Sequence, residues 1–268
     1  MHRFFGIRCS YRSIISFLYN QGGCLMRVRS AFAISAFLRI IVFFLLVFAH
    51  VDRVSAKGFD IDFGFMAGQP TGDFSEEVDR DGYGFSVEGV YRLSFLPFGV
   101  GFEFGWMNYG HESRKEPLSP TIPDLRVRVV NNNNIISSNI LLRFQPYEGR
   151  VTPFIDGILG LKYLYTETHI EDVDSGPYNL SSKNYDDTAF QYGIGGGTFI
   201  RLVRIKNFSK KDQIVDFSLN CRMKYMKGRK ADYLTKKSII RNGTDVTYDV
   251  KSSNTDMLFY HVGLALQF

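Results

Sequence analysis

Two polar residues, His111 and Ser113, have the spacing of a histidine that could activate a serine nucleophile. In such a pair the imidazole accepts the hydroxyl proton as the oxygen attacks. Three charged residues, Arg114, Lys115 and Glu116, follow directly in the sequence. This composition is typical of a polar rim or loop edge, so we interpret the segment as a rim cluster and keep a hydrolytic role as an alternative.

A glycine-rich stretch, residues 193–197, superficially mimics a phosphate-binding loop. A true dinucleotide fingerprint joins a strand to a helix, whose N-terminus faces the phosphate. Here the glycines lie inside an alternating strand pattern, and no helical pattern follows them. We therefore predict that they are small interior residues that allow strands to close tightly.

Histidine and cysteine give no metal or redox site. His169 and His261 have no partner at metal-ligand spacing, and we expect the first at a rim and the second in an interior. Cys221 is the only cysteine after residue 56, so that part of the chain has no pair for an internal disulfide. The sequence thus predicts no catalytic, cofactor-binding or metal-binding residues, no cofactor and no enzymatic activity.

The composition separates a basic leader from a neutral remainder. The chain has 268 residues, 45% of them hydrophobic and 15% aromatic, and a formal net charge of +5. Residues 1–56 contain seven Arg and one Asp, whereas residues 57–268 contain 25 Lys and Arg against 26 Asp and Glu. The basic pI therefore belongs to the leader, and we expect no nucleic-acid partner.

The leader has the layout of a secretory signal. After Met26 come two arginines, an apolar run at 40–49 and the small residues of Val54-Ser55-Ala56. We predict a leader at 1–56, with a signal peptide at 26–56 that is cleaved after Ala56; Met1 and Met26 both remain possible starts. An uncleaved anchor is the alternative, but it needs about 20 apolar residues, and Arg39 interrupts this run.

Period-two alternation dominates residues 57–268. In the first segment, Phe59, Ile61, Phe63 and Phe65 alternate with smaller or polar residues, which is the pattern of a strand. Similar segments occur at 57–68, 82–95, 99–112, 134–145, 153–170, 187–203, 213–231 and 256–268. We predict an all-β domain over 57–268, an eight-stranded antiparallel up-and-down barrel, and leave ten strands open.

The connections between these segments alternate in length. Long polar ones are expected at 69–81, 113–133, 171–186 and 232–255, and shorter ones at 96–98, 146–152 and 204–212. Long loops at one end and short turns at the other are typical of a transmembrane β-barrel.

One face of the strands carries most of the large side chains. An eight-stranded interior is just wide enough to be filled by side chains, so we predict that these residues face lipid: Tyr83, Phe85, Phe102, Phe104, Trp106, Leu142, Phe144, Tyr163, Tyr165, Tyr192, Phe217, Tyr225, Leu264 and Leu266. The opposite face is rich in Gly, Ser and charge. Its expected charges are Asp60, Asp62, Glu88, Glu103, Asp156, Asp216, Arg92, Arg143, Lys162, Arg201, Arg222 and Lys224. Six acidic against six basic groups indicate a paired, closed lumen.

Several motifs resemble those of the small bacterial outer-membrane β-barrel family that includes OmpA- and OmpX-like proteins. They are Pro70-Thr71-Gly72-Asp73-Phe74, Pro153-Phe154-Ile155-Asp156-Gly157, Gly193-Ile194-Gly195-Gly196-Gly197, Arg222-Met223-Lys224-Tyr225 and a last strand that ends on Phe268. The resemblance implies export to the outer membrane, insertion by the barrel-assembly machinery, and contact with outer-membrane lipid and lipopolysaccharide. Lipid A deacylases on similar barrels carry a His-x-Ser pair, but on later strands than His111 and Ser113.

We therefore predict a non-enzymatic outer-membrane barrel with a structural or surface-interaction role, in which long extracellular loops contact a host or surface ligand. A narrow porin-like channel for small or apolar solutes is the first alternative. A lipid-modifying enzyme that uses Ser113 is the second.

Overall fold

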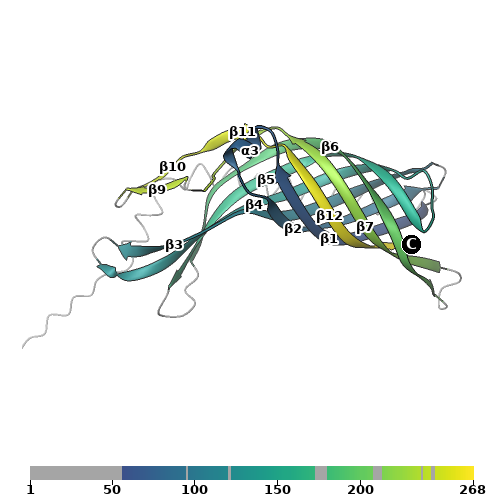
Figure 1. Ribbon diagram of the computed structural model, residues 1–268, viewed down its shortest axis with the longest axis horizontal. Coiled ribbons are helices and arrows are strands. Elements are labelled where there is room, and N and C mark those ends of the chain that lie inside the picture. Colours follow the sequence, from purple (N-terminus) through teal and green to yellow (C-terminus); the bar gives the residue numbers. More distant parts are fainter. Residues whose placement is uncertain are drawn as a thin grey trace, which may run out of the picture. The chain divides into compact units, whose positions relative to one another are not determined.

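The structure is a computed structural model that describes residues 56–94, 96–119, 122–172, 180–207, 213–236, 238–242 and 245–268. The predicted leader at 1–56 lies outside these residues apart from Ala56. Eight strands form a closed antiparallel barrel in the order β1-β12-β7-β6-β5-β4-β3-β2 (Figure 1). The barrel strands are β1 (Ala56–Pro70), β2 (Gly82–Leu93), β3 (Phe98–Ser119), β4 (Ile122–Phe144), β5 (Val151–Asp172), β6 (Leu180–Asn207), β7 (Gln213–Gly228) and β12 (Met257–Gln267).

The prediction of an eight-stranded up-and-down barrel is confirmed, because each expected segment is a barrel strand. The ring closes where the last strand pairs with the first, with Phe63 opposite Leu264 and Phe65 opposite Val262. The final residue continues the seam, since the backbone N–H of Phe268 donates to the carbonyl of Phe59 at 2.9 Å. A closed ring leaves no unpaired strand edge, as a strand in lipid requires.

The barrel has two unlike ends. We name the end that carries the β1–β2, β3–β4, β5–β6 and β7–β12 connections the loop end, and the opposite end the turn end. The loop end also holds α3 (Asp73–Glu77) and four short strands: β8 (Lys230–Tyr233), β9 (Ile239–Asn242), β10 (Asp245–Tyr248) and β11 (Lys251–Asn254). β8 pairs with β11, and β9 pairs with β10, as two small sheets outside the ring.

The expected loop over 113–133 is wrong for its described residues, 113–119 and 122–133, which belong to β3 and β4. β3 and β4 keep pairing beyond the barrel, with Arg114 opposite Val129 and Glu116 opposite Val127. The sequence carries a strand pattern there, because Val127 and Val129 alternate with arginines. The expected loop over 171–186 is likewise wrong for its described residues, because 171–172 belong to β5 and 180–186 to β6.

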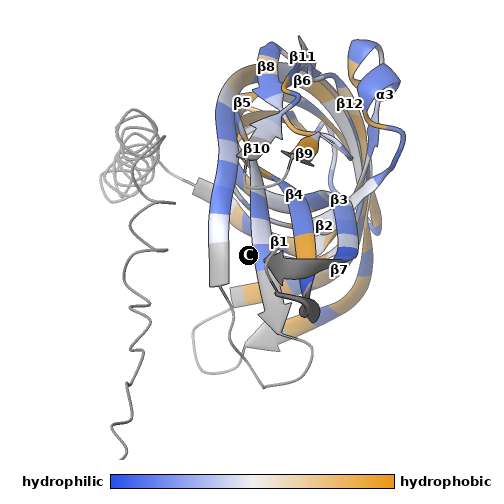
Figure 2. Ribbon diagram, turned by 90° about the vertical axis from the view of Figure 1, so that its left-hand side faces the viewer, coloured by the Kyte–Doolittle hydropathy of each residue, from blue (hydrophilic) through white to orange (hydrophobic). Residues whose placement is uncertain are grey.

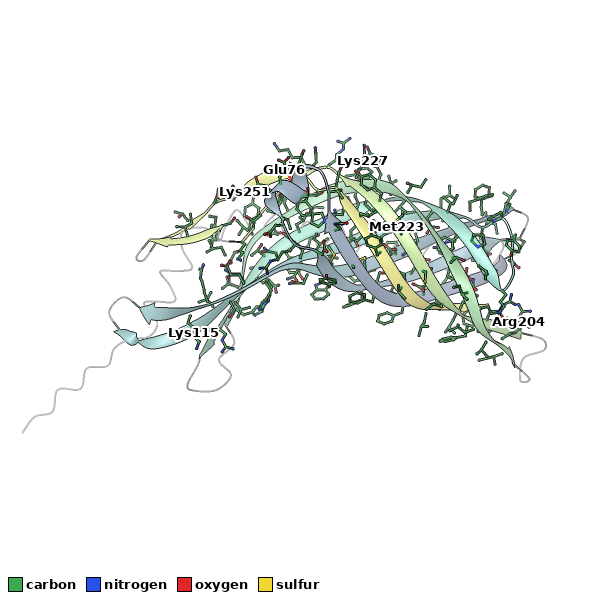
Figure 3. All side chains as sticks on the ribbon, in the orientation of Figure 1. Glu76, Lys115, Arg204, Met223, Lys227 and Lys251 are labelled. Carbon is green, nitrogen blue, oxygen red and sulfur yellow. The ribbon has the colours of Figure 1, made fainter. Side chains whose placement is uncertain are left out.

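The facing prediction is confirmed. None of the large side chains assigned to the lipid face is buried, and Phe63 and Tyr83 are 59% and 56% exposed. In Figure 2, apolar and polar residues alternate along the barrel strands. Figure 3 shows side chains standing off the barrel wall, with Met223 on β7 and Arg204 at the turn end. An apolar belt of this kind is stable only against lipid, so the barrel spans a membrane.

Among the described residues, no helix is both long and apolar enough to cross a membrane.

We expect an arginine in the middle of this belt to destabilise the protein strongly. Phe63→Arg should lower the free energy of unfolding from lipid vesicles by about 2–4 kcal/mol, because the charge faces hydrocarbon. Tyr83→Arg is the matched control: Tyr83 is similarly exposed but lies near the loop end, where an arginine costs about 0–1 kcal/mol. Urea titration of vesicle-inserted protein measures both, and equal losses would contradict the position of the belt.

Candidate functional site

A buried ionic network crosses the lumen around Arg222 of β7. Its guanidinium pairs with Glu88 of β2 and Glu103 of β3, and lies 3.3 Å from the carboxylate of Asp156 of β5. Lys224 pairs with Glu103 as well. These contacts connect β7 to three strands that are not its neighbours in the ring.

A second guanidinium, that of Arg143 on β4, completes the network. It lies 2.7 Å from Glu88 and holds Asp156 in a two-point contact at 2.8 and 2.9 Å. Its flat face covers the ring of Phe154 at 4.0 Å. Burying such charges is tolerated only when each has a partner and satisfied hydrogen bonds. For the six charges of this network, the predicted pairing inside the lumen is thus confirmed as direct contact.

Three of the predicted lumen charges belong to the turn end instead of the sealed interior. Arg92 contacts Asp60 at 3.1 Å and the exposed Glu148 at 3.0 Å. Arg201 lies 3.3 Å from Asp216, which also receives a two-point contact from the exposed Arg204 at 2.7 Å. These residues lie on the expected inner face of their strands. They are partly exposed because they are close to the strand ends.

Lys162 of β5 differs from the other buried lumen charges. Its side chain is fully buried, and Nζ donates to the backbone carbonyl of Thr255 at 2.6 Å. The ring of Phe259 lies 6.0 Å away. The prediction that this lysine pairs with a lumen carboxylate is therefore corrected: its partner is a carbonyl of the loop end.

A serine, a histidine and an aspartate line up inside the barrel wall. Ser86 Oγ lies 3.0 Å from Nδ1 of His261, and Nε2 of the same ring lies 2.7 Å from Asp62 Oδ1. They come from β2, β12 and β1, which are neighbours in the ring. Gly64 and Gly263 make room for the imidazole, since a Cβ on Gly263 would come within 2.6 Å of Nε2.

This arrangement has the order of groups found in a catalytic triad, but its environment is structural. The three side chains are at most 2% exposed, so the serine oxygen is closed off from any substrate. The histidine instead places Nε2 within ion-pair distance of the buried Asp62, which needs a polar partner in this environment. The sequence analysis placed His261 in the interior but missed the trio. The signal that could have revealed the trio is that all three residues occupy lumen-facing positions in the alternating pattern of three neighbouring strands.

Apart from Lys162, the half of the lumen nearer the loop end is largely apolar, which the sequence did not predict. Four methionines, one from each of β1, β3, β7 and β12, fill it with almost no exposure: Met66, Met107, Met226 and Met257. They lie against glycines, because a Cβ on Gly68 or on Gly193 would come within 2.7 Å of a methionine sulfur. Unbranched, flexible methionine suits such irregular space.

A cap of aromatic residues covers the methionines at the loop end. Phe74 of α3 is completely buried, and its ring lies 5.0 Å from that of Tyr233 on β8 and 5.9 Å from that of Tyr109 on β3. Burial raises the pKa of the Tyr233 hydroxyl, so this group stays protonated. The cap thus joins α3 and β8 to the rim of the barrel.

Ion pairs join the remaining parts of the cap. Lys251 of β11 lies 3.3 Å from Asp249 and 3.7 Å from Glu77 of α3. The hydrogen bond from Lys251 to Asp249, followed by the nearby negative charges, raises the pKa of Lys251. Asn254 also donates to Asp73 at 3.1 Å. These contacts hold β11 against α3.

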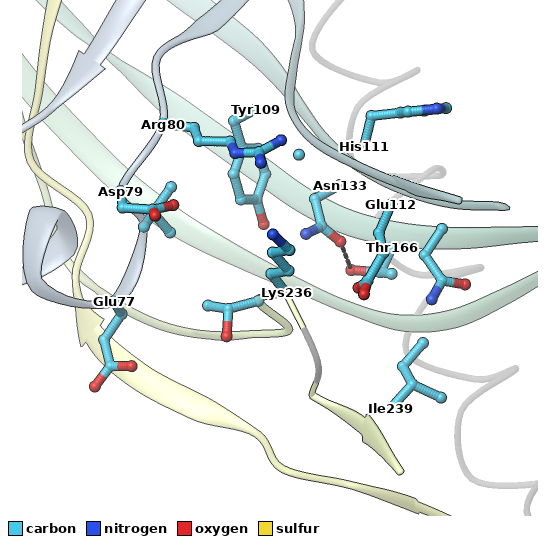
Figure 4. A pocket seen from close by; sticks show the side chains of 14 residues that line it. Glu77, Asp79, Arg80, Tyr109, His111, Glu112, Asn133, Thr166, Lys236 and Ile239 are labelled. Carbon is cyan, nitrogen blue, oxygen red and sulfur yellow. Dashed lines mark hydrogen bonds between the residues drawn. The ribbon is translucent and has the colours of Figure 1, made fainter. Parts of the chain in front are cut away.

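Beside the cap lies a polar hollow (Figure 4). Its cavity volume is about 40 Å³, and its mouth opens to solvent. Barrel strands supply Tyr109, Asn133 and Thr166, and the connections around α3 and β8 supply Arg80 and Lys236. The hydroxyl of Thr166 donates to Asn133 Oδ1 at 2.8 Å. This hollow is the most site-like feature of the loop end.

The remaining sequence candidates are placed as follows. His111 and Ser113 are both exposed on β3, and the ring of His111 lies 2.8 Å from Asn132 Oδ1. The pair is therefore a rim cluster, as interpreted. His169 lies at the loop end, 3.6 Å from Glu167. The glycines at 193–197 lie inside β6, and the interior prediction holds for all but Gly196, which shares the outward face of the strand with the exposed Ile194. Among the described residues, no group of His, Cys, Asp and Glu is arranged to hold a metal.

The closed ring, the apolar belt and the packed lumen define an eight-stranded transmembrane β-barrel. Open-edged or irregular backbone is excluded from hydrocarbon, and barrels of this kind are the architecture of bacterial outer membranes. The protein is accordingly an outer-membrane barrel of the small eight-stranded class.

Solved structures of outer-membrane barrels are similar to this chain at low sequence identity and low TM-scores. Ail, the attachment invasion locus protein of Yersinia pestis, in complex with the heparin analogue sucrose octasulfate, is 15% identical, with a TM-score of 0.41 over 79% of this chain and 99% of that one. The N-terminal β-barrel domain of Pseudomonas aeruginosa OprF is 12% identical, with a TM-score of 0.32 over 78% and 97%. A major outer membrane protein from Thermus thermophilus is 11% identical, with a TM-score of 0.36 over 78% and 99%.

No protein-family model matches the chain, and no curated protein matches it. The likeness to the solved structures concerns the fold alone.

We expect the Arg222 network to be essential for stability. Arg222→Met leaves Glu88 and Glu103 short of a buried partner and should cost about 3–5 kcal/mol in the free energy of unfolding. Arg204→Met removes an equally well-aligned arginine–aspartate pair from the exposed turn end and should leave stability nearly unchanged. Urea titration in vesicles compares the two. Similar losses of unfolding free energy in the two variants would contradict a particular role of the lumen ion pairs in stability.

We expect Ser86 to be structural. Ser86→Ala leaves His261 Nδ1 without its hydroxyl partner and should cost about 1–3 kcal/mol in the free energy of unfolding. The wild-type protein should not react with a fluorophosphonate probe, because the serine oxygen is buried. Ser113→Ala is the exposed control, and it should change neither stability nor the acyl chains of lipid A. Labelling at Ser86 would contradict the structural role.

Proposed function

We propose that this protein is a closed, non-enzymatic outer-membrane barrel that acts at the cell surface through its loop end. The observation that carries the proposal is the packed lumen. The Arg222 network fills one half, the methionines fill the other, and the aromatic cap covers the loop end. A barrel filled in this way fixes the loop end in the membrane and leaves its surface available for contacts outside the cell.

The lengths of the connections support an orientation with the loop end outward. Outer-membrane barrels have short periplasmic turns and long extracellular connections. At the turn end, β2 and β3 are separated only by residues 94–97, and β4 and β5 by residues 145–150. At the loop end, residues 229–256 separate β7 from β12 and include four short strands.

The strands themselves support a role for the loop end in contact. β3 to β6 continue pairing well past the end of β2, so a four-stranded sheet stands above the barrel rim. It is rigid, because polar side chains cross-link its strands: Thr168 donates to Asn131 at 2.6 Å. A rigid projecting sheet presents a surface without the entropy cost of ordering a free loop on binding.

The proposal includes a route to the membrane and the surrounding lipid. Residues 26–56 would direct export and be removed after Ala56, and residues 57–268 would be inserted by the barrel-assembly machinery. Lipopolysaccharide would then surround the loop end. An aromatic group at the rim supports this contact: Trp106 donates to the hydroxyl of Tyr165 at 3.3 Å, and aromatic side chains of this kind gather at membrane interfaces.

Conductance tests the closed barrel against the channel alternative. The purified full-length protein, inserted in a planar bilayer, should give no steady conductance above that of the bare bilayer. The gel-mobility shift between unheated and boiled samples of the same preparation checks that the barrel is folded. A large, steady conductance that changes in Arg143→Gln would contradict the proposal and favour a narrow channel.

A further inference from the structure

We propose that the hollow beside the cap binds a neutral saccharide. The inference rests on the proposed function, because it takes the loop end to face the cell exterior. The hollow is lined by three parts of the chain that are distant in sequence: the segment after α3, the rim of β3 to β5, and the connection after β8. Convergence of separate elements on one polar hollow is typical of a ligand site.

The buried hydroxyl of Tyr109 is the main reason to expect a ligand. Tyr109 is only 3% exposed, and its oxygen has no hydrogen-bond partner among the described residues. In Figure 4 its hydroxyl points into the hollow, toward Lys236 and Asn133. Buried polar atoms in proteins are almost always hydrogen-bonded. A ligand hydroxyl seated in the hollow would supply the missing partner.

Two irregularities of the sheet aim side chains into the hollow. The register of β3 against β4 shifts between Asn108 and Gly110, which places Tyr109 at the bulge. The register of β5 against β6 shifts between Thr166 and Glu167. Bulges redirect side chains and are over-represented beside functional sites. Both occur here at residues that line or adjoin the hollow.

The mixture of charges selects the class of ligand. Three carboxylates, those of Glu77, Asp79 and Glu112, share the lining with the cations of Arg80 and Lys236. Carboxylates accept hydrogen bonds from ligand hydroxyls, and the cations donate to them. A phosphate or sulfate group would meet carboxylates as well as cations in this lining, so its charge gains little there. A neutral ring with several hydroxyls satisfies both kinds of group.

Part of the lining is already in place for a ligand. Tyr109, Asn133 and Thr166 lie on barrel strands, and Thr166 already orients the Asn133 amide at 2.8 Å. The walls are held by the cap, in which the ring of Phe74 lies 5.0 Å from that of Tyr233. Preorganised donors and acceptors reduce the ordering cost of binding. The open mouth suits the terminal unit of a glycan.

The experiment is a glycan array with the full-length protein, purified in an amine-oxide detergent because sugar-headgroup detergents would compete. The array carries neutral glycans beside sulfated and phosphorylated ones. The wild-type protein should bind a neutral glycan in preference to the anionic ones. Titration with that glycan should show about a tenfold loss of affinity in Tyr109→Phe, the loss of one buried hydrogen bond of about 1.4 kcal/mol.

Tyr147→Phe is the matched control, because Tyr147 is an exposed tyrosine near the turn end, and it should bind as the wild type does. Tyr109→Phe keeps the ring that packs on Phe74, and the gel-mobility shift checks that it folds. Lys236→Gln should weaken binding as well. Absence of binding to every neutral glycan, preference for anionic glycans, or unchanged affinity in Tyr109→Phe would overturn the inference.

The outcome is independent of the conductance test. A non-conducting barrel that binds no neutral glycan would refute the saccharide site and leave the closed barrel intact. A conducting barrel whose glycan binding depends on Tyr109 would refute the closed barrel and keep the site at the mouth of a channel.

Discussion

The pairing of Arg222 with Glu88 and Glu103 inside the lumen is the interaction on which the rest of the structure depends. A charge in this position has lost its water, and only opposite charges on other strands replace it. The contacts therefore join β7 to β2 and β3 across the interior. Arg143 extends the connection to β4 and β5 through Glu88 and Asp156. These ion pairs connect strands on different sides of the ring and so stabilise the closed barrel.

Each strand faces lipid on one side and a charged lumen on the other, and the two environments require different side chains. Hydrocarbon requires that every backbone group be paired within the ring and that outward side chains be apolar. The narrow interior requires small residues or tightly matched charges, and Gly64 and Gly263 show how little room is left beside the His261 ring. Alternation along each strand meets both requirements, because successive side chains point to opposite faces of the strand.

The two halves of the lumen differ in composition and in what they stabilise: one half contains the ion pairs, and the other contains the methionines. The charged half braces the ring. The methionines and the cap close the loop end, where Phe74 joins α3 to Tyr233 of β8 and to Tyr109 of β3. The extended sheet of β3 to β6 and the polar hollow then stand on a closed base.

The sequence by itself determined the barrel, the face toward lipid and the presence of paired interior charge, and it predicted eight strands while leaving ten open. Each of these follows from period-two alternation and from the volume available inside eight strands, which are local or purely geometric properties. Tertiary structure decided which charges meet, because partners such as Arg222 and Glu88 lie on strands far apart in the chain. It also placed Ser86, His261 and Asp62 together through strand register, and turned the expected loop after Ser113 into a paired extension. The hollow around Tyr109 required the same information, since a bulge and two distant connections create it only when the ring closes.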